Sequence, residues 1–164
     1  MAAGDPIAEA AEIGFQASSA LTAWATTESQ LVAARNYWLA TVRPEGRPHV
    51  VPVWGVWLDN VLYFSTGEKS RKARNLGREP RCAFSVESGD LHLVVEGSVS
   101  RVNEEALLQR MAAAYTPKYD WPLSLRDGGV HGEGGGGPVY AVKPAVAFAF
   151  DLGGAFSATR YRFV

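Results

Sequence analysis

The residues best suited to chemistry lie in a short stretch between positions 63 and 76. There an apolar strand pattern ends in small hydroxyl residues and leads into a basic helix. Backbone N–H groups at a helix N-terminus are unpaired, hydroxyl groups add donors, and cationic side chains match the charge of a phosphate. A solvated basic helix face is the alternative, but the hydroxyl residues stand immediately ahead of the charges and favour an anion site. The predicted phosphate contacts are Ser65, Thr66, Gly67, Lys69, Ser70, Arg71 and Lys72.

A second candidate is the apolar stretch at residues 50–57, which a proline and a glycine interrupt. Pro52 has no N–H to donate to a β ladder, so the strand is expected to bulge or to lie at a sheet edge there. Either arrangement frees backbone groups to face a ligand. The alternative is a plain edge strand whose bulky side chains belong to the core. The predicted ligand contacts are Val51, Pro52, Val53 and Trp54.

A third candidate is the C-terminal stretch at residues 159–163, where aromatic and cationic residues alternate. In an extended chain they lie on opposite faces, so that one face can stack while the other binds anions. Thr159 and Arg160 are the predicted contacts. A solvated edge strand is the alternative and has equal weight.

No side chain stands out as a nucleophile or a metal ligand. The sequence contains no dinucleotide-binding glycine motif, Walker loop, nucleophile elbow or metal-binding helix motif. Cys82 is interpreted as a small buried hydrophobe, and the three histidines are too scattered for a zinc site. No catalytic residue and no metal site are therefore predicted, and a bound cofactor has to supply the reactive atom.

Length and composition narrow the class of protein. The chain has 164 residues, which suits one domain, and a formal net charge of -1, which disfavours binding to nucleic acid or to a membrane surface. A single cysteine excludes an intrachain disulfide, and no apolar run reaches the length of a membrane span. A cytoplasmic protein that acts on a small molecule is expected.

The elements that position the candidate residues are mostly strands. Turn signatures at residues 43–46 and 59–60 predict three consecutive antiparallel strands, and a helix from residue 70 to 78 follows. Six to seven mostly antiparallel strands with a few short helices predict a mainly β fold, a small barrel. The strand patterns cover residues 37–42, 49–58, 61–65, 81–87, 91–102, 139–142 and 145–150.

Other stretches carry weaker signals. Residues 1–26 have a weak helical pattern around residues 8–13 and are expected to form a weakly ordered or helical arm ahead of a domain at residues 27–164. Thr27 and Gln30 have the spacing of a capping box, and Asn103 is placed to cap a later helix. Residues 116–138 are expected to be a long flexible loop, because they are rich in proline and glycine.

Four blocks of the sequence resemble the pyridoxamine 5'-phosphate oxidase-like flavin/deazaflavin oxidoreductases in order and spacing, over about residues 27–163. The blocks are residues 37–42, 46–49, 51–54 and 65–76. The resemblance implies a split β-barrel homodimer with two cofactor sites between the subunits. It also implies that the stretch around residues 70–72 binds the cofactor phosphate, while the strand at residues 51–54 lies along the tricyclic ring.

Two departures from that family pattern are informative. Val51 and Val56 stand where true pyridoxamine phosphate oxidases carry an arginine and a lysine, and Tyr161-Arg162 follows Arg160 in place of an arginine-x-histidine motif. Activity as a vitamin oxidase is therefore not expected, and the pattern is closer to the deazaflavin branch, with coenzyme F-420 favoured over FMN. The resemblance implies hydride transfer to a small electron-poor substrate, with Thr159 and Arg160 of the other subunit closing the site. A non-catalytic carrier of a cofactor or haem and a plain dimeric interaction module are the alternatives.

Overall fold

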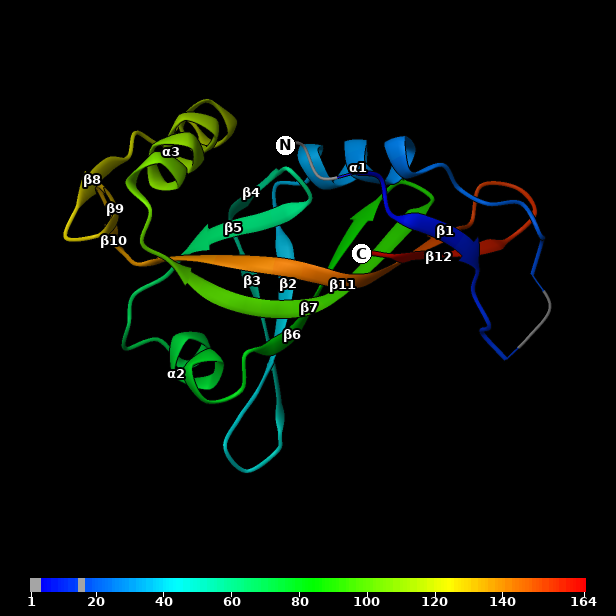
Figure 1. Ribbon diagram of the computed structural model, residues 1–164, viewed down its shortest axis with the longest axis horizontal. Helices are drawn as coiled ribbons and strands as arrows, with labels where there is room; N and C mark the ends of the chain where they lie inside the picture. Colours follow the sequence, from blue (N-terminus) through cyan, green and yellow to red (C-terminus); the bar gives the residue numbers. More distant parts are fainter. Residues whose placement is uncertain (1–3, 15–16) are drawn as a thin grey trace.

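The computed structural model describes residues 4–14 and 17–164. The three helices of the described residues are α1 (Trp24–Ala33), α2 (Arg71–Arg78) and α3 (Glu105–Tyr119). None of them is long and apolar enough to cross a membrane. The strands are β1 (Ile7–Ala10), β2 (Tyr37–Val42), β3 (Pro48–Val53), β4 (Gly55–Leu58), β5 (Val61–Ser65), β6 (Arg81–Ser88), β7 (Leu91–Val102), β8 (Ser124–Arg126), β9 (Gly129–Gly132), β10 (Gly135–Gly137), β11 (Val139–Asp151) and β12 (Ser157–Arg162) (Figure 1).

Six strand positions close into a barrel. Antiparallel pairs join β2 to β6, β6 to β7, β7 to β11, β11 to β5, and β5 to β4. The ring returns to its start because a single residue separates the end of β3 from the start of β4, and β3 pairs with β2. The ring is split at that one residue, Trp54, because β3 before it pairs with β2 whereas β4 after it pairs with β5. The mainly β, antiparallel barrel expected from the sequence is confirmed, and β1, β12 and the short strands β8–β10 add to it.

The two hairpin turns follow from local backbone chemistry. Between β2 and β3, Gly46 adopts a φ of 82°, and its N–H donates to the Arg43 carbonyl at 2.8 Å. Between β4 and β5, Asp59 and Asn60 have φ values of 50° and 61°. Two consecutive positive φ values are those of a type I′ turn, which Asp and Asn tolerate better than other side chains. Both predicted turns are confirmed.

Strand β11 organises the main sheet because it pairs with three others. Its first half pairs with β5 and its second half with β12, while β7 runs along the other edge. The register with β7 shifts between Pro144 and Val146, and Gly97 lies opposite this bulge. A Cβ at Gly97 would overlap the Lys143 carbonyl group, so only glycine fits there. The bulge bends β11, and a bent central strand lets the sheet curl into a barrel.

The N-terminal stretch differs from the expected helix. Residues Ile7–Ala10 form β1, which pairs antiparallel with the edge of β12. An unpaired sheet edge offers backbone partners that a short alanine-rich helix lacks, so pairing prevails over helix propensity. Residues 1–3 and 15–16 of the expected arm lie outside the described residues. A domain boundary at residues 26 and 27 stays a prediction.

Both predicted helix caps are wrong. Helix α1 begins at Trp24, and Thr27 lies inside it, buried, with its hydroxyl 2.8 Å from the Tyr161 hydroxyl. At α3 the N-cap position is Glu104 and not Asn103, and its side chain makes no capping hydrogen bond. The spacing of a capping box was present, but a tertiary hydrogen bond uses the Thr27 hydroxyl.

The glycine-rich stretch at residues 116–138 is also ordered differently from the expected flexible loop. Helix α3 continues to Tyr119, and β8, β9 and β10 form a separate three-stranded antiparallel sheet. Val130 of this sheet is buried in an apolar cluster that also contains Leu108 and Met111 of α3. This burial compensates for the entropy lost when the glycines are ordered. The long-loop prediction is therefore wrong.

Candidate functional site

The start of α2 has the architecture expected of an anion site. The Ser70 hydroxyl caps the helix by accepting from the Ala73 N–H at 3.2 Å, and the Thr66 hydroxyl donates to Ser70 Oγ at 3.1 Å. Ser65 fixes the preceding turn by donating to the Gly137 carbonyl at 3.1 Å. Among the described residues, the N–H groups of Arg71 and Lys72 have no partner. The predicted turn-and-helix arrangement therefore leaves backbone donors at the helix start.

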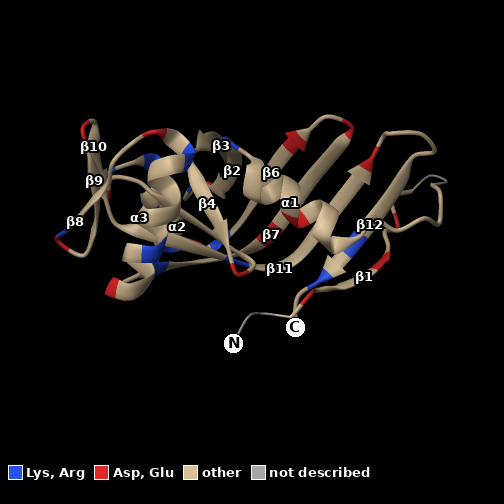
Figure 2. Cartoon of the chain, turned by 90° about the horizontal axis from the view of Figure 1, so that it is seen from above, with Lys and Arg blue, Asp and Glu red and all other residues tan. Residues whose placement is uncertain are grey.

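The cations of α2 are left without carboxylate partners within the described part of the chain. Four of the eight residues of α2 are Lys or Arg (Figure 2), and none of the ion pairs involves them. The arginines of the strands, by contrast, are mostly paired: Arg160, for example, lies 3.0 Å from Glu9. The positive charge of α2 is therefore not neutralised internally.

The β2–β3 hairpin brings two further basic residues, Arg43 and His49, to the same place. Burial lowers the pKa of His49, and the neighbouring charges of Arg43, Lys72 and Arg71 lower it further. Burial also lowers the pKa of Lys72. Like charges are held together at a cost, which an anionic ligand would remove. Arg43, His49, Arg71 and Lys72 are called the α2 cation cluster below.

Two buried polar atoms at this cluster have no hydrogen-bond partner within the described residues. They are Arg43 Nε and Asn75 Oδ1. Asn75 of α2 is 1% exposed and donates to the Thr41 hydroxyl of β2 at 2.9 Å, which ties the helix to the strand. The Thr41 hydroxyl lies 3.3 Å from His49 Nδ1. Unpaired buried donors are uncommon, and Arg43 Nε fits a site whose ligand supplies acceptors.

The free edge of β3 leads away from this cluster. Among the described strands, β3 pairs only with β2, so its other edge carries unpaired backbone groups, and the expected edge position of Pro52 is confirmed. Val53 is buried in the core and Val51 is half-buried against it, whereas Pro52 and Trp54 are exposed. From His49 to Trp54 the edge spans about 16 Å at the usual rise per residue.

Helix α3 clamps the far end of this edge at the break after Trp54. The Trp54 ring stacks on Tyr119 with centroids 4.7 Å apart and planes 7° from parallel. The Gly55 N–H donates to the Tyr119 hydroxyl at 3.0 Å, and the Gly55 carbonyl accepts from Lys118 Nζ at 3.1 Å. The backbone groups that the strand break leaves unpaired are thus satisfied by α3. Burial lowers the pKa of Lys118 to about 8, and the neighbouring charge of Arg35 contributes.

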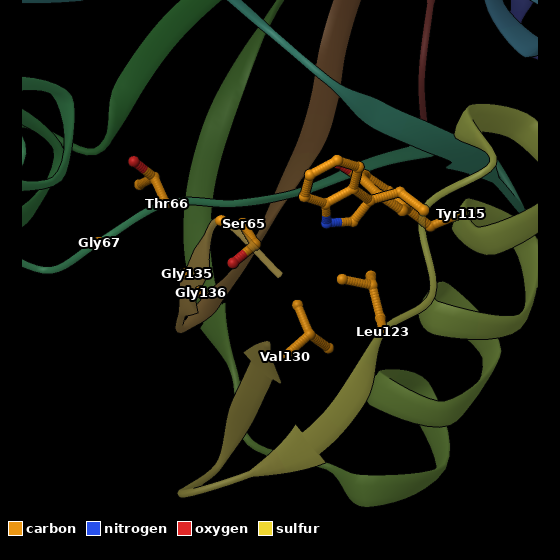
Figure 3. A pocket seen from close by; sticks show the side chains of 10 residues that line it. Ser65, Thr66, Gly67, Tyr115, Leu123, Val130, Gly135 and Gly136 are labelled. Atoms are coloured by element: carbon orange, nitrogen blue, oxygen red, sulfur yellow. The ribbon is translucent and has the colours of Figure 1, made fainter. Parts of the chain in front are cut away.

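Two neighbouring cavities flank the turn at residues 65–69. They share Gly67 and Gly136. The uncharged cavity has a volume of about 370 Å³ (Figure 3), and it is lined by Ser65, Thr66, Gly67, Tyr115, Trp121, Leu123, Val130, Gly134, Gly135 and Gly136. The charged cavity has a volume of about 440 Å³, and it is lined by Gly67, Glu68, Lys69, Arg101, Asp127, His131, Gly136, Gly137 and Pro138. Lys69 therefore lines the charged cavity, whereas Arg71 and Lys72 line neither of the two cavities.

The structure does not bring the C-terminal candidates to this region of the chain. Thr159 and Arg160 lie on β12, at the end of the sheet away from α2 and α3 (Figure 1). Thr159 is 0% exposed, and its hydroxyl accepts from the Thr22 N–H at 2.8 Å. Arg160 is exposed and pairs with Glu9.

Sequence reasoning missed several residues of the region. Arg43 and His49 lie in the predicted hairpin, but only the packing of α2 against β2 brings them to the cation cluster. Tyr119 and Trp121 lie in the stretch that was interpreted as a loop. The one available signal was the spacing of Tyr115 and Tyr119. They lie four residues apart, so they share a face if the predicted helix is lengthened to include both.

These features define a class of protein: a split β-barrel with a capped, cation-rich helix start beside the open edge of its wall. Residues 25–132 match the family described as Pyridoxamine 5'-phosphate oxidase. The chain belongs to this family. No curated protein matches the sequence.

Solved structures agree with this assignment. The conserved hypothetical protein Rv2991 from Mycobacterium tuberculosis aligns with a TM-score of 0.67 and 24% identity over 80% of this chain and 86% of that one. A protein described as an F420 reductase has a TM-score of 0.56 and 30% identity, over 73% of this chain and 94% of that one. A haem-binding protein from Mycobacterium smegmatis has a TM-score of 0.62 and 17% identity, over 84% and 57% of the two chains, which shows the fold alone.

Proposed function

We propose that the protein is an oxidoreductase that binds a deazaflavin coenzyme of the F-420 type, or alternatively FMN, and transfers hydride to a small electron-poor organic substrate. The observation that carries the proposal is the α2 cation cluster, which is unneutralised and adjoins a capped helix start. The 30% identity to a protein described as an F420 reductase, over 94% of that chain, supports the deazaflavin over FMN.

The residues present fit a phosphorylated tricyclic coenzyme. Phosphate oxygens would accept hydrogen bonds from Arg43 Nε and from the backbone N–H groups of Arg71 and Lys72. The Ser65–Thr66–Gly67 turn and Ser70 would hold the helix start in place. The free edge of β3 would seat the ring, with Pro52 and Trp54 as its exposed contacts. Lys69 lines the charged cavity next to this site and would attract the anionic groups of the ligand.

The chemistry needs little from the side chains. A bound reduced coenzyme would supply a hydride, and with a proton from solvent the substrate would gain two electrons and two hydrogens. The residues of this chain orient both molecules and exclude water. No catalytic side chain is proposed.

We also propose that the active form is a homodimer. Trp38, Val42 and Val50 are 49%, 42% and 57% exposed, and the register of β2 and β3 places all three on one face. An exposed apolar face of this kind is expected to be covered, and a second copy of the chain is the proposed occupant. In the proposed dimer, the partner subunit's Arg160 would close the cofactor site. Thr159 is buried, so it would act only indirectly, by holding β12 in place. A cytoplasmic location stays a prediction.

The test is a comparison of two titrations followed by a turnover assay. Purified apo-protein is titrated with FMN and with the deazaflavin coenzyme, and fluorescence reports both affinities. We expect tighter binding of the deazaflavin, and oxidation of its reduced form by a panel of quinones, enones and nitroaromatics. Light scattering measures the dimer.

The rival function is a non-catalytic carrier of the same cofactor or of haem, since haem-binding proteins share the fold. Tight binding without hydride transfer to any member of the panel would favour this rival. Absence of any chromophore binding would leave a dimeric interaction module and refute the proposal.

A further inference from the structure

The uncharged cavity between α3 and the β9–β10 hairpin is separate from the α2 cation cluster. None of the residues that line it is ionised at neutral pH, whereas the neighbouring charged cavity contains two carboxylates, a lysine, an arginine and a histidine. Figure 3 shows Tyr115 and Leu123 on one side of the uncharged cavity and Ser65, Gly135 and Gly136 on the other. A cavity of about 370 Å³ is within the range that holds small organic ligands.

The lining of this cavity combines aromatic rings, Tyr115 and Trp121, with the bare backbone of Gly134, Gly135 and Gly136. Glycine lets a ligand approach the peptide plane closely because no Cβ intervenes. Aromatic rings and bare peptide planes both suit contact with a planar, conjugated molecule.

Glycine also fixes the Trp121 ring. A Cβ at Gly132 would overlap Nε1 of Trp121, and a Cβ at Gly134 would lie 3.4 Å from its Cζ2. The indole therefore packs directly on the hairpin backbone at Gly132. Tyr115 is held in turn by Tyr119, with ring centroids 4.5 Å apart. The two aromatic walls are thus positioned before any ligand binds.

Two hydrogen-bond donors in this wall are unused within the described residues. Neither the Tyr115 hydroxyl nor the Trp121 indole N–H has a hydrogen-bond partner there, whereas the Tyr119 hydroxyl on the same helix is engaged with Gly55. Burial raises the pKa of Tyr115, so its hydroxyl stays protonated and can donate. A ligand with an acceptor atom, such as a carbonyl oxygen, can pair with a donor of this kind.

From these observations we infer that the uncharged cavity is the binding site for the molecule to be reduced, and that this molecule is a neutral, planar aromatic or conjugated carbonyl compound. The assignment rests on the proposed function, since it names the substrate class. The turn at residues 65–67 lines this cavity and continues to the capped start of α2, so the site adjoins the proposed coenzyme site. Anionic substrates are disfavoured, because none of the residues that line this cavity is a cation.

The experiment uses two probes with the same ring. Calorimetric titration of the full-length protein with 2-acetylnaphthalene, a neutral ketone, is compared with titration with 2-naphthoate, its anionic counterpart. We expect the ketone to bind and the carboxylate to bind at least tenfold more weakly. Tyr115→Phe keeps the ring and removes its donor, and Trp121→Phe keeps an aromatic side chain but removes the indole N–H. Each should weaken ketone binding roughly fivefold. Equal affinities for both probes would overturn the assignment.

A blocking variant and its control complete the test. Gly134→Leu adds a side chain beside Trp121 at an ordinary contact distance, and it should abolish ketone binding. Ala113→Leu adds a leucine on the exposed face of α3 and should leave binding unchanged. If Gly134→Leu still reduces enones at the wild-type rate, the cavity assignment fails and the proposed function stands. If the ketone binds the cavity but no coenzyme binds the protein, the proposed function fails.

Discussion

The clamp between α3 and the strand break makes a prediction about a single oxygen atom. Tyr119→Phe keeps the ring that stacks on Trp54 and removes only the hydroxyl. That hydroxyl accepts from the Gly55 N–H at 3.0 Å and lies 2.8 Å from the Gly55 carbonyl and 2.9 Å from the Arg35 carbonyl. The Gly55 carbonyl keeps Lys118 as a donor, but the buried Gly55 N–H loses its acceptor.

The cost follows from that one orphaned donor. An unsatisfied buried N–H costs about 1–3 kcal/mol, so we expect Tyr119→Phe to lower the free energy of unfolding by about 2 kcal/mol. For a domain of this size that corresponds to a fall in Tm of about 4–8 °C. Tyr115→Phe is the matched control, because the Tyr115 hydroxyl has no hydrogen bond within the described residues. It should change stability by less than about 0.5 kcal/mol.

Urea unfolding at a fixed protein concentration measures both variants, since the proposed dimer would make stability depend on concentration. The m-value should stay constant, so that the midpoint alone reports the change. Equal midpoints for Tyr119→Phe and Tyr115→Phe would refute the clamp. The two variants are also expected to exchange roles in ligand binding, where Tyr115→Phe weakens the ketone and Tyr119→Phe leaves its affinity unchanged.

Three further predictions concern the barrel and the α2 cation cluster. Exchanging Arg71 and Lys72 for alanine should weaken coenzyme binding by a few kcal/mol, at ~1.5–3 kcal/mol per charge-assisted hydrogen bond. Arg78→Ala is the control and should leave coenzyme binding unchanged. Fluorescence titrations that give equal effects would contradict the role of Arg71 and Lys72 as phosphate anchors. The pKa of His49 should lie below its usual value and rise in Lys72→Ala. Phosphate affinity should increase as the pH falls through that pKa, because the imidazolium attracts the anion. An NMR titration in which Lys72→Ala leaves the His49 midpoint unchanged would argue against the cluster. Gly97→Ala should destabilise the protein by about 1–3 kcal/mol through overlap with the Lys143 carbonyl. Gly77→Ala is the control: it has open space around it and should stabilise α2. Similar melting temperatures for the two variants would count against the bulge argument.

Local chemistry made part of this structure predictable. The turns at Gly46 and Asn60, the helix that follows residue 70, and the edge position of Pro52 each depend on a few neighbouring residues, so the sequence pattern was sufficient. The barrel followed because alternating strands separated by short turns have few ways to bury one face. The phosphate role of Ser65 to Lys72 was inferred from the same local logic and remains a prediction.

Tertiary contacts account for what sequence reasoning missed. Thr27 has the type and spacing of a helix cap, yet its hydroxyl bonds Tyr161, 134 positions away. The glycines after residue 128 resembled a flexible linker, because a sequence pattern does not show that Val130 is buried against α3. Arg43 and His49 were not assigned to the site for a related reason: Asn75 joins α2 to β2 across the fold.

The triple pairing of β11 limits where the chain can change in length. A residue inserted into its first half would disturb the facing of side chains against β5 and β7 together, and one inserted into its second half would do so against β7 and β12, so no single neighbour could shift to compensate. The hairpin between β9 and β10 contacts no strand of the main sheet through a ladder, so added residues there would alter the wall of the uncharged cavity and leave the barrel register intact. Segment grafts at this hairpin are therefore the natural route to new substrate preferences on this scaffold.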